Sequence, residues 1–399
     1  MSSHFVRVGP VRAPIFSVPY RTTKSSPMPR LSVTQASPTH ITLNGRTLLS
    51  FGGCNYLGLA HHPGVHAALI DGLSQFGLST SASRETTGNT VVHDQLEAAL
   101  CRFLSMPAAV VVPDGYTANL AIAQAIVASH PIAVVDARSH KSIREAVACA
   151  GMTLVEFDHL DAGHAAEQIA RHSGRGVVVF TDGVFTADGG LAPVPELLSA
   201  LPPGGILVVD DCHGFCTIGF GGQGTLAYTQ VADPRLVLTT TLAKGLGCHG
   251  GVVAGPTAVC DLVRSKASAY ICTTPVSPAI AAAAIEAINI VQREPQRVAR
   301  LRANISQLAA ALKAAGVGFE SRNTPIFAFT LESEHRMRRL HADLLSDGIL
   351  APLISYPGGP AACYFRLSVS SEHTTEEIDR LTAALFRRLE VAHPTRIAV

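Results

Sequence analysis

Five short apolar runs constrain the fold of this 399-residue chain more than any other feature. Each run ends in a turn with polar residues, and apolar residues at helical spacing follow most of these turns. Strands that alternate with helices predict an α/β fold, in which a mostly parallel sheet is sandwiched by helices. Ligands of such sheets bind beyond the carboxyl ends of the strands. The runs begin at residues 108, 131, 177, 206 and 236.

The pattern changes after residue 276, which predicts a smaller α+β C-terminal domain, residues 277–399, beside a large cofactor-binding domain, residues 47–276. An Ala/Ile/Leu-rich helix or helix pair is expected up to about Gly316. Beyond it the sequence predicts strands at 325–331 and 364–370 and helices near 337–345 and 375–389.

Residues 1–46 form a segment with six arginine and lysine residues and no acid. Such a segment cannot fold by itself, so we expect an N-terminal arm that orders against a partner subunit. Its positive charge would attract an anionic substrate or carrier protein.

Composition narrows the class of protein. A hydrophobic content of 47% and a net charge of +1 give no reason to expect nucleic-acid binding. The longest apolar helix-like stretch is interrupted by Glu286, so no membrane-spanning helix is expected. The nine cysteines are scattered and odd in number, which favours reduced thiols and a cytoplasmic location. Cys212, His213 and Cys216 resemble a metal cluster only superficially, and no metal site is expected.

Lys244 follows the run that begins at residue 236 and has apolar neighbours. An amine that is partly desolvated is a good nucleophile for Schiff-base chemistry, although a surface lysine at a strand end would look the same. Asp210 and His213 end the preceding run. Alone, they could equally be a metal-binding strand end; together with Lys244, an acid that can hold a protonated ring nitrogen favours pyridoxal 5'-phosphate.

Other strand ends supply further candidates. Gly115 and Tyr116 begin a helix whose free amides could bind a phosphate. His140 could lie flat on a pyridine ring, and Asp182 and Thr186 follow the next strand. Arg366 alternates with apolar residues, so it could either bind a carboxylate or face solvent.

The ordered motifs of the chain resemble those of the α-oxoamine synthases, fold-type-I pyridoxal phosphate transferases. These motifs are NYLGL, SR with TG and H..LE, GY..N, D...H.SI, DGVF..DG, DD.HG, T..KG.G and RLS....H. The resemblance implies that Lys244 forms the Schiff base and Asp210 pairs with the pyridinium. It implies that His213 binds the phenolic oxygen and His140 stacks on the ring.

The same resemblance implies contacts beyond the ring. It places Gly115, Tyr116 and Thr241 at the phosphate and gives Thr186 the position of a family serine. It makes Arg366 the group that binds the amino-acid carboxylate. Thr273 or Thr274 would come from the partner subunit, which implies an obligate homodimer with shared active sites.

Three departures from the family bear on the substrate. Cys54 stands where relatives of 8-amino-7-oxononanoate synthase usually have Asn, immediately before Asn55 in the expected substrate site. The segment 355–362 and Asp114 also differ. A role in biotin synthesis is therefore not favoured.

We accordingly expect a homodimeric biosynthetic acyltransferase that condenses an α-amino acid with an acyl thioester, on CoA or a carrier protein, with loss of carbon dioxide. The alternatives are an aminotransferase, a retro-aldol lyase, since the cofactor apparatus is shared, or a non-catalytic partner subunit.

Overall fold

A seven-stranded sheet forms the centre of the computed structural model, which describes residues 32–320, 322–356 and 358–389. Its strand order is β4-β10-β9-β8-β7-β5-β6, and only β10 runs antiparallel to its neighbours. The five predicted runs all become strands, which confirms the mostly parallel sheet. The strands are β4 (Ala108–Val112), β5 (Ile132–Asp136), β6 (Thr153–Phe157), β7 (Val177–Asp182), β8 (Ile206–Asp210), β9 (Leu236–Thr241) and β10 (Gly251–Gly255).

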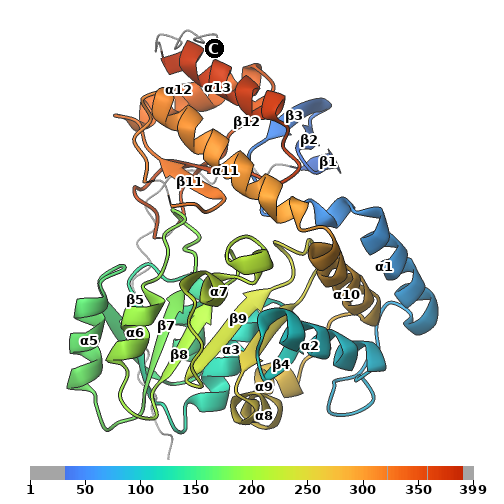
Figure 1. Ribbon diagram of the computed structural model, residues 1–399, viewed down its shortest axis with the longest axis vertical. Helices are drawn as coiled ribbons and strands as arrows, with labels where there is room; N and C mark the ends of the chain where they lie inside the picture. The colour runs from blue at the N-terminus through green and yellow to red at the C-terminus, as the bar shows by residue number, and fades with distance from the viewer. Residues whose placement is uncertain (1–31, 321, 357, 390–399) are drawn as a thin grey trace, which may run out of the picture. The chain divides into compact units, whose positions relative to one another are not determined.

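Helices cover both faces of this sheet (Figure 1). Because successive strand residues point to opposite faces, the apolar side chains of the sheet divide between two cores. Val208 and Val253 pack with one group of helices, whereas Val209 and Val252 pack with the other. The first group is α3 (Gly115–Ile126), α4 (Lys141–Cys149), α8 (Thr257–Lys266) and α9 (Ser268–Ile271); the second includes α2 (Val91–Leu104), α5 (Ala162–Arg171), α6 (Val194–Ala200) and α7 (Thr225–Thr229).

The C-terminal part of the chain contains a separate three-stranded antiparallel sheet, which includes the two strands expected at 325–331 and 364–370 and a third strand that was not predicted. Its order is β11 (Ile326–Phe329), β14 (Tyr364–Ser368) and β13 (Leu353–Ile354). Helices α11 (Gln296–Ala314) and α12 (Glu334–Ser346) both pack against α13 (Thr375–Leu389). In the register of this sheet Arg366 lies opposite Ala328.

Residues 33–46 fold differently from the prediction of an N-terminal arm. They belong to a four-stranded sheet made of β1 (Val33–Ala36), β2 (His40–Leu43), β3 (Arg46–Ser50) and β12 (Ile349–Leu350). Asn44 and Gly45 have φ values of 50° and 74°, the backbone of an Asn-Gly hairpin turn. The predicted arm is therefore wrong over this stretch, because the Asn-Gly turn lets the chain pair with itself as a hairpin. Residues 1–31 lie outside the described residues.

The expected helix pair after residue 276 is present, but its two members pack with different partners. Helix α10 (Pro278–Arg293) packs against α1 (Pro63–Phe76) and α2, whereas α11 packs against α13. A Cβ atom on Gly72 of α1 would lie 2.8 Å from the Cα atom of Ala279, so the glycine permits the close approach of α1 and α10. The predicted boundary at residue 276 thus separates α10 from the helices that it contacts.

Candidate active site

A cavity of about 220 Å³ lies at the carboxyl ends of the central strands. Its lining includes every residue expected at the cofactor except Thr273 and Thr274. The turns after β4, β5, β7, β8 and β9 all contribute to it, as the rule for parallel sheets predicts. The lining residues are Gly115, Tyr116, His140, Ser142, Asp182, Val184, Thr186, Asp210, Cys212, His213, Thr241 and Lys244.

Lys244 reaches into this cavity from the turn after β9. Its Nζ lies 2.8 Å from His213 Nε2. Glycines shape the turn, because a Cβ on Gly245 would lie 2.6 Å from the Phe215 carbonyl oxygen and one on Gly247 2.3 Å from the Ala60 nitrogen. The two glycines that follow the lysine in the sequence therefore allow its turn to pack closely.

His213 is buried and has a second partner that the sequence did not reveal. Its Nδ1 lies 2.7 Å from the hydroxyl of Tyr56, a side chain that is only 1% exposed. Burial, together with the nearby Lys244 ammonium, lowers the pKa of His213 well below its ordinary value. The imidazole is therefore neutral at physiological pH. Tyr56 lies within the NYLGL motif, and its position in that motif is the sequence feature that could have indicated a role in the site.

Asp210 is held in one orientation by two donors. The side-chain amide of Asn119 donates to Asp210 Oδ2 over 2.7 Å, and the Cys212 backbone N–H donates to Oδ1 over 3.1 Å. Asn119 in turn accepts a hydrogen bond from the Thr239 hydroxyl at 2.7 Å. Asn119 was present in the GY..N motif but carried no expected role. Its position one helical turn after Gly115 brings it to the strand ends.

His140 and Asp182 also line the cavity. The His140 backbone N–H donates to Asp182 Oδ1 over 3.1 Å, and its ring Nδ1 lies 2.6 Å from the Ser142 hydroxyl. Asp182 Oδ2 is buried and has no hydrogen-bond partner among the described residues. Burial, with Asp210 nearby, raises the pKa of Asp182 well above its ordinary value.

The start of α3 forms a cradle of backbone amides at the cavity. A Cβ atom on Gly115 would lie 3.1 Å from the Thr241 Cβ and 3.2 Å from the Cys212 Sγ, so a larger residue would crowd this cradle. Asp114 caps the helix by accepting from the Thr117 N–H over 2.7 Å.

These groups together fit pyridoxal 5'-phosphate. One cavity is lined by a lysine amine, a fixed carboxylate, a histidine ring and a helix N-terminus. Asp182 Oδ2 in this cavity is buried and has no hydrogen-bond partner among the described residues. In this arrangement Lys244 would hold the carbonyl carbon, Asp210 the ring nitrogen and Gly115 the phosphate.

Arg366 reaches toward the rim of the cavity from β14. Its Nε donates to the Thr186 carbonyl oxygen over 2.7 Å, and Tyr56 and Cys54 both lie beside its guanidinium. The solvent-facing alternative for Arg366 is therefore wrong. Asn55 makes a local contact, since its side-chain oxygen accepts from the Ala60 N–H over 3.3 Å. Its expected role in substrate binding stays a prediction.

Thr273 and Thr274 lie away from the cavity of their own chain. The Thr273 hydroxyl donates to the Ala269 carbonyl oxygen over 2.8 Å, and Thr274 is exposed. A contact with the cofactor would therefore have to be made across a subunit interface.

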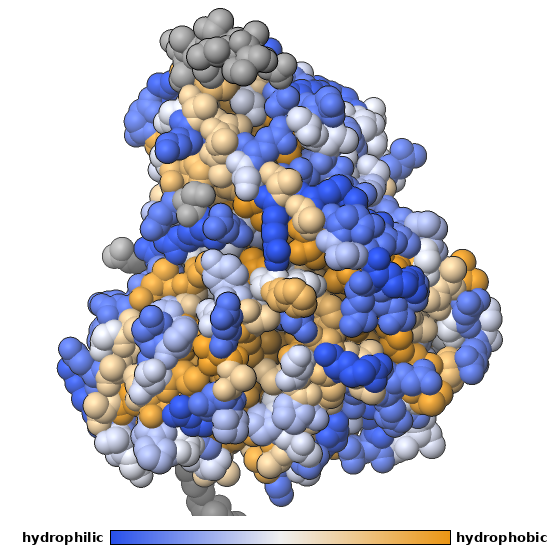
Figure 2. Space-filling model, in the orientation of Figure 1, coloured by the Kyte–Doolittle hydropathy of each residue, from blue (hydrophilic) through white to orange (hydrophobic). Residues whose placement is uncertain are grey.

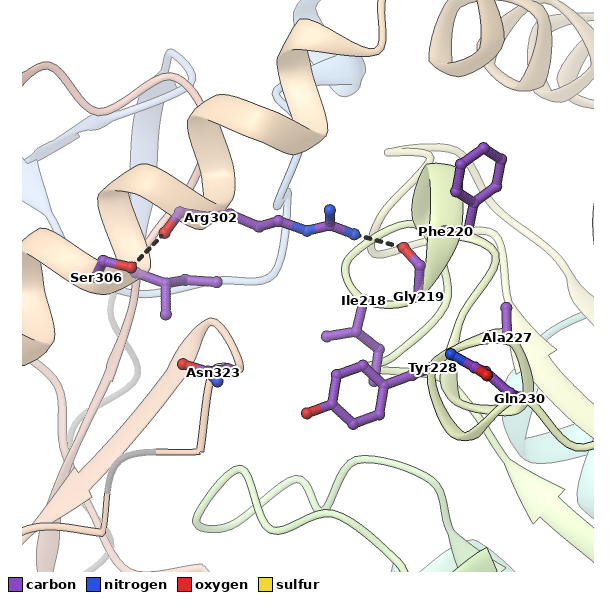
Figure 3. A pocket seen from close by; sticks show the side chains of 10 residues that line it. Ile218, Gly219, Phe220, Ala227, Tyr228, Gln230, Arg302, Ser306 and Asn323 are labelled. Atoms are coloured by element: carbon purple, nitrogen blue, oxygen red, sulfur yellow. Dashed lines mark hydrogen bonds between the residues drawn. The ribbon is translucent and has the colours of Figure 1, made fainter.

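A second and larger cavity, about 470 Å³, lies elsewhere in the molecule (Figure 3). The loop and helix around residues 218–230 form one wall, and Arg302 and Ser306 of α11 form the other. Its lining and that of the first cavity have no residue in common among those described.

Among the described residues, no three His, Cys, Asp or Glu side chains are grouped so that they could hold a metal ion. No helix within the described ranges is both long and apolar enough to cross a bilayer.

Known proteins of similar sequence include 8-amino-7-oxononanoate synthases. Residues 46–385 match the family model for aminotransferase class I and II. A protein of Desulforudis audaxviator named for 8-amino-7-oxononanoate synthase is 36% identical over 89% of this chain and 93% of its own length. The 8-amino-7-oxononanoate synthase of Methylobacillus flagellatus is 33% identical over 87% of this chain and 88% of its own.

Solved structures similar to the chain include serine palmitoyltransferases. Serine palmitoyltransferase of S. paucimobilis, solved as a variant with PLP and myriocin bound, superimposes with a TM-score of 0.85 at 27% identity. The match covers 91% of this chain and 94% of that one. Serine palmitoyltransferase of Sphingomonas wittichii also gives a TM-score of 0.85, at 26% identity over 90% and 93% of the two chains.

Proposed function

Because the chain belongs to the α-oxoamine synthase family of pyridoxal 5'-phosphate enzymes, we propose that it catalyses the condensation of an α-amino acid with an acyl thioester in this cavity. The products are an α-amino ketone, carbon dioxide and the free thiol. The observation that carries this assignment is the convergence of Lys244, Asp210 and His140 on one cavity with Arg366 at its rim.

The residues divide the chemistry between them. Pyridoxal phosphate, when bound, supplies a ring that accepts electrons from the substrate carbon. Asp210, fixed by Asn119, keeps a positive ring nitrogen in place. Lys244 Nζ is the base that takes the proton from the amino acid's α-carbon, and His213 Nε2, 2.8 Å from Nζ, is placed to stabilise the oxyanion that develops on the thioester carbonyl.

Arg366 orients the amino acid. Its Nε is occupied by the Thr186 carbonyl, which leaves donors at its terminal nitrogens for a carboxylate. A planar guanidinium held at one nitrogen presents the others in a fixed direction, so it selects the orientation in which the α-carbon lies near Lys244.

The thiol of Cys54 supports a pathway other than biotin synthesis. Cys54, which replaces the family's Asn, lies beside the Arg366 guanidinium. The replacement therefore changes the surroundings of the residue that we expect to bind the carboxylate. A thiol is a weak hydrogen-bond donor, whereas an amide donates two hydrogens. We therefore infer that this enzyme uses another amino acid, another acyl group, or both.

The names of the curated relatives favour a second candidate, synthesis of 8-amino-7-oxononanoate. The structure of that product requires alanine, which supplies its last two carbons, and a seven-carbon acyl group with a terminal carboxylate.

A panel assay separates these candidates. Purified enzyme is incubated with each amino acid and with CoA and carrier-protein thioesters of varied chain length, and thiol release and product mass are measured. We expect an α-amino ketone from a pair other than alanine with the seven-carbon ω-carboxyacyl thioester. If that pair gives the highest kcat/KM, the biotin assignment replaces ours. Keto acids or aldehydes without thiol release would indicate an aminotransferase or a lyase.

The exposed face of α1 supports a homodimer. Leu69, Ile70 and Leu73 of this helix, with Leu78 just after it, are exposed. Figure 2 shows hydrophobic residues at the edge of the molecule where Figure 1 places α1. Exposed apolar stripes of this kind are typical of subunit interfaces. Light scattering should give twice the chain mass, and the double variant Ile70→Asp, Leu73→Asp should shift the mass toward that of one chain.

A further inference from the structure

Asp182 lines the cofactor cavity but has no part in the chemistry described above. The residue is buried and only 2% exposed. Its Oδ1 accepts from the His140 backbone N–H over 3.1 Å, whereas its Oδ2 has no hydrogen-bond partner among the described residues. Burying a charged carboxylate oxygen without a donor is costly, while a protonated oxygen carries no charge. The unpartnered oxygen therefore favours a hydrogen on Oδ2.

The neighbouring carboxyl, Asp210, favours the same protonation state. Asp182 of β7 and Asp210 of β8 are register partners in parallel strands, and both line the cavity. Two carboxylates in one buried site repel each other, so such a pair retains a proton. Asp210 accepts from the Asn119 amide and the Cys212 N–H, over 2.7 and 3.1 Å. Among the described residues Asp182 accepts one such bond, so the negative charge is better stabilised on Asp210 and the proton belongs on Asp182.

The other titratable groups near Asp182 do not reverse this distribution. They are a basic residue, an acid and three groups that stay neutral, namely Lys244, Asp136, His140, Tyr356 and Cys212. Burial lowers the pKa of His140 and raises the pKa of Tyr356 and Cys212. Lys244 opposes the protonation of Asp182, and Asp136 favours it. Burial, with Asp210 nearby, raises the pKa of Asp182 well above its ordinary value.

We propose that Asp182 is a neutral carboxylic acid whose Oδ2 donates a hydrogen bond to an oxygen of the bound cofactor, while Asp210 is the carboxylate of the pair. Asp182 thereby helps to bind the cofactor without adding a second negative charge beside the ring nitrogen. The inference rests on the proposed role of Asp210 and is independent of which amino acid and thioester the enzyme uses.

The cofactor affinity of three variants tests the charge of Asp182. An amide reproduces the proposed acid, because its oxygen can accept from the His140 N–H and its NH₂ can donate in place of Oδ2. Asp182→Asn should therefore keep the Kd of pyridoxal phosphate within about threefold, and Asp182→Ala should raise it about tenfold through the loss of one hydrogen bond. Asp210→Asn removes a charge and should raise the Kd by more than about tenfold. Equilibrium dialysis of the full-length holoenzyme against graded cofactor concentrations measures each Kd.

Two results of this measurement would overturn the proposal. If Asp182 were a carboxylate, Asp182→Asn would remove a charge, and the Kd would change by about tenfold or more. A wild-type Kd in Asp182→Ala would show that the donor is unused. Thermal unfolding verifies that each variant folds, and Asp182→Asn keeps the shape of the side chain if Asp182→Ala does not fold.

Infrared difference spectra measure the protonation state without any assay of activity. The C=O stretch of a protonated carboxyl is separate from the bands of a carboxylate, and ¹³C-labelled aspartate identifies it. We expect the wild-type holoenzyme to show a protonated-acid band at neutral pH that Asp182→Asn lacks. Asp211, whose pKa burial raises to about 7, is present in both proteins, so its own band cancels. Asp71→Asn, at an exposed position of α1, is the control and should lose no such band.

The outcomes separate this inference from the proposed function. If Asp210→Asn binds the cofactor as tightly as wild type, the proposed role of Asp210 fails, whereas the infrared band still decides the charge of Asp182. If Asp210→Asn loses affinity but Asp182→Asn loses no protonated-acid band, only the inference about Asp182 fails.

Discussion

The cavity at the strand ends and the cavity of Figure 3 occupy about 220 and 470 Å³, and the chemistry that we propose lies in the smaller one. In the smaller cavity the polar side chains are tied to one another and converge on a shared space. In the larger one, Arg302 donates to the Gly219 carbonyl oxygen, while Phe220 is 85% exposed. We therefore assign the functional site of this protein from the convergence of fixed titratable groups and not from the volume of a cavity.

The difference follows from how each cavity is built. Parallel strands end at one edge, and their register places Asp182 of β7 directly opposite Asp210 of β8. The larger cavity lies between α11 and the loop and helix at residues 218–230, where no such strand register brings side chains together. Four predictions test this comparison.

The largest effect is expected at Lys244. Lys244→Ala should lower the condensation rate by about a thousandfold or more, because nucleophile and base are the same amine. The wild-type protein should be yellow because of an absorption band of the bound cofactor. The variant should lack this band unless an external amine is added. Lys266→Ala, at the exposed end of α8, is the matched control and should behave as wild type. A colourless wild type that takes up no pyridoxal phosphate would contradict the assignment.

A change of Arg366, at the rim of the same cavity, should weaken binding of the amino acid but not of the cofactor. Arg366→Ala should raise the apparent Kd for the amino acid by about 10–100-fold, the loss of a charge-assisted bidentate contact, while cofactor affinity stays the same. Arg366→Lys should recover little, because an ammonium lacks the planar fork. Titration of amino-acid binding by absorption measures both. Unchanged amino-acid affinity in Arg366→Ala would refute the role.

Asp211 should affect stability rather than chemistry, although it is adjacent to Asp210. Its carboxylate accepts hydrogen bonds from the Thr225 N–H and hydroxyl, and burial raises its pKa from 3.8 to about 7. Because the folded pKa lies above the unfolded one, the stabilisation is complete below pH 4 and is lost as pH rises through 7, by up to about 4 kcal/mol.

Asp211→Asn should remove this dependence. The unfolding free energy of the variant, measured in urea between pH 4 and 8, should vary less with pH than that of wild type. Asp71→Asn, at an exposed position of α1, is the control and should keep the wild-type slope. An unaltered slope in Asp211→Asn would place the titrating group elsewhere.

The smallest effect is expected in the cavity of Figure 3. Phe220→Ala should change kcat/KM by less than about twofold and stability by about 0.5 kcal/mol or less, as exposed substitutions usually do. Steady-state kinetics with the best thioester decide this. A fivefold rise in the KM for the thioester would make the larger cavity part of the binding site and break the comparison.

The sequence by itself determined many of the elements and the residues at their ends. Apolar runs indicated the five strands, and the expected helix at 375–389 has the bounds of α13. Lys244, Asp210 and His140 could be found because a strand end has a defined place in a parallel sheet. Local periodicity and chain order carry that information.

Only the tertiary structure decided which side chains meet. Tyr56 and His213 are 157 residues apart, Arg366 and Thr186 are 180 apart, and Asn119 contacts Asp210 from another element. The hairpin at residues 40–50 found its partner β12 some 300 residues later, and α10 joined α1 rather than α13. Such contacts depend on how elements pack and on the direction each side chain takes, and spacing along a chain does not encode either.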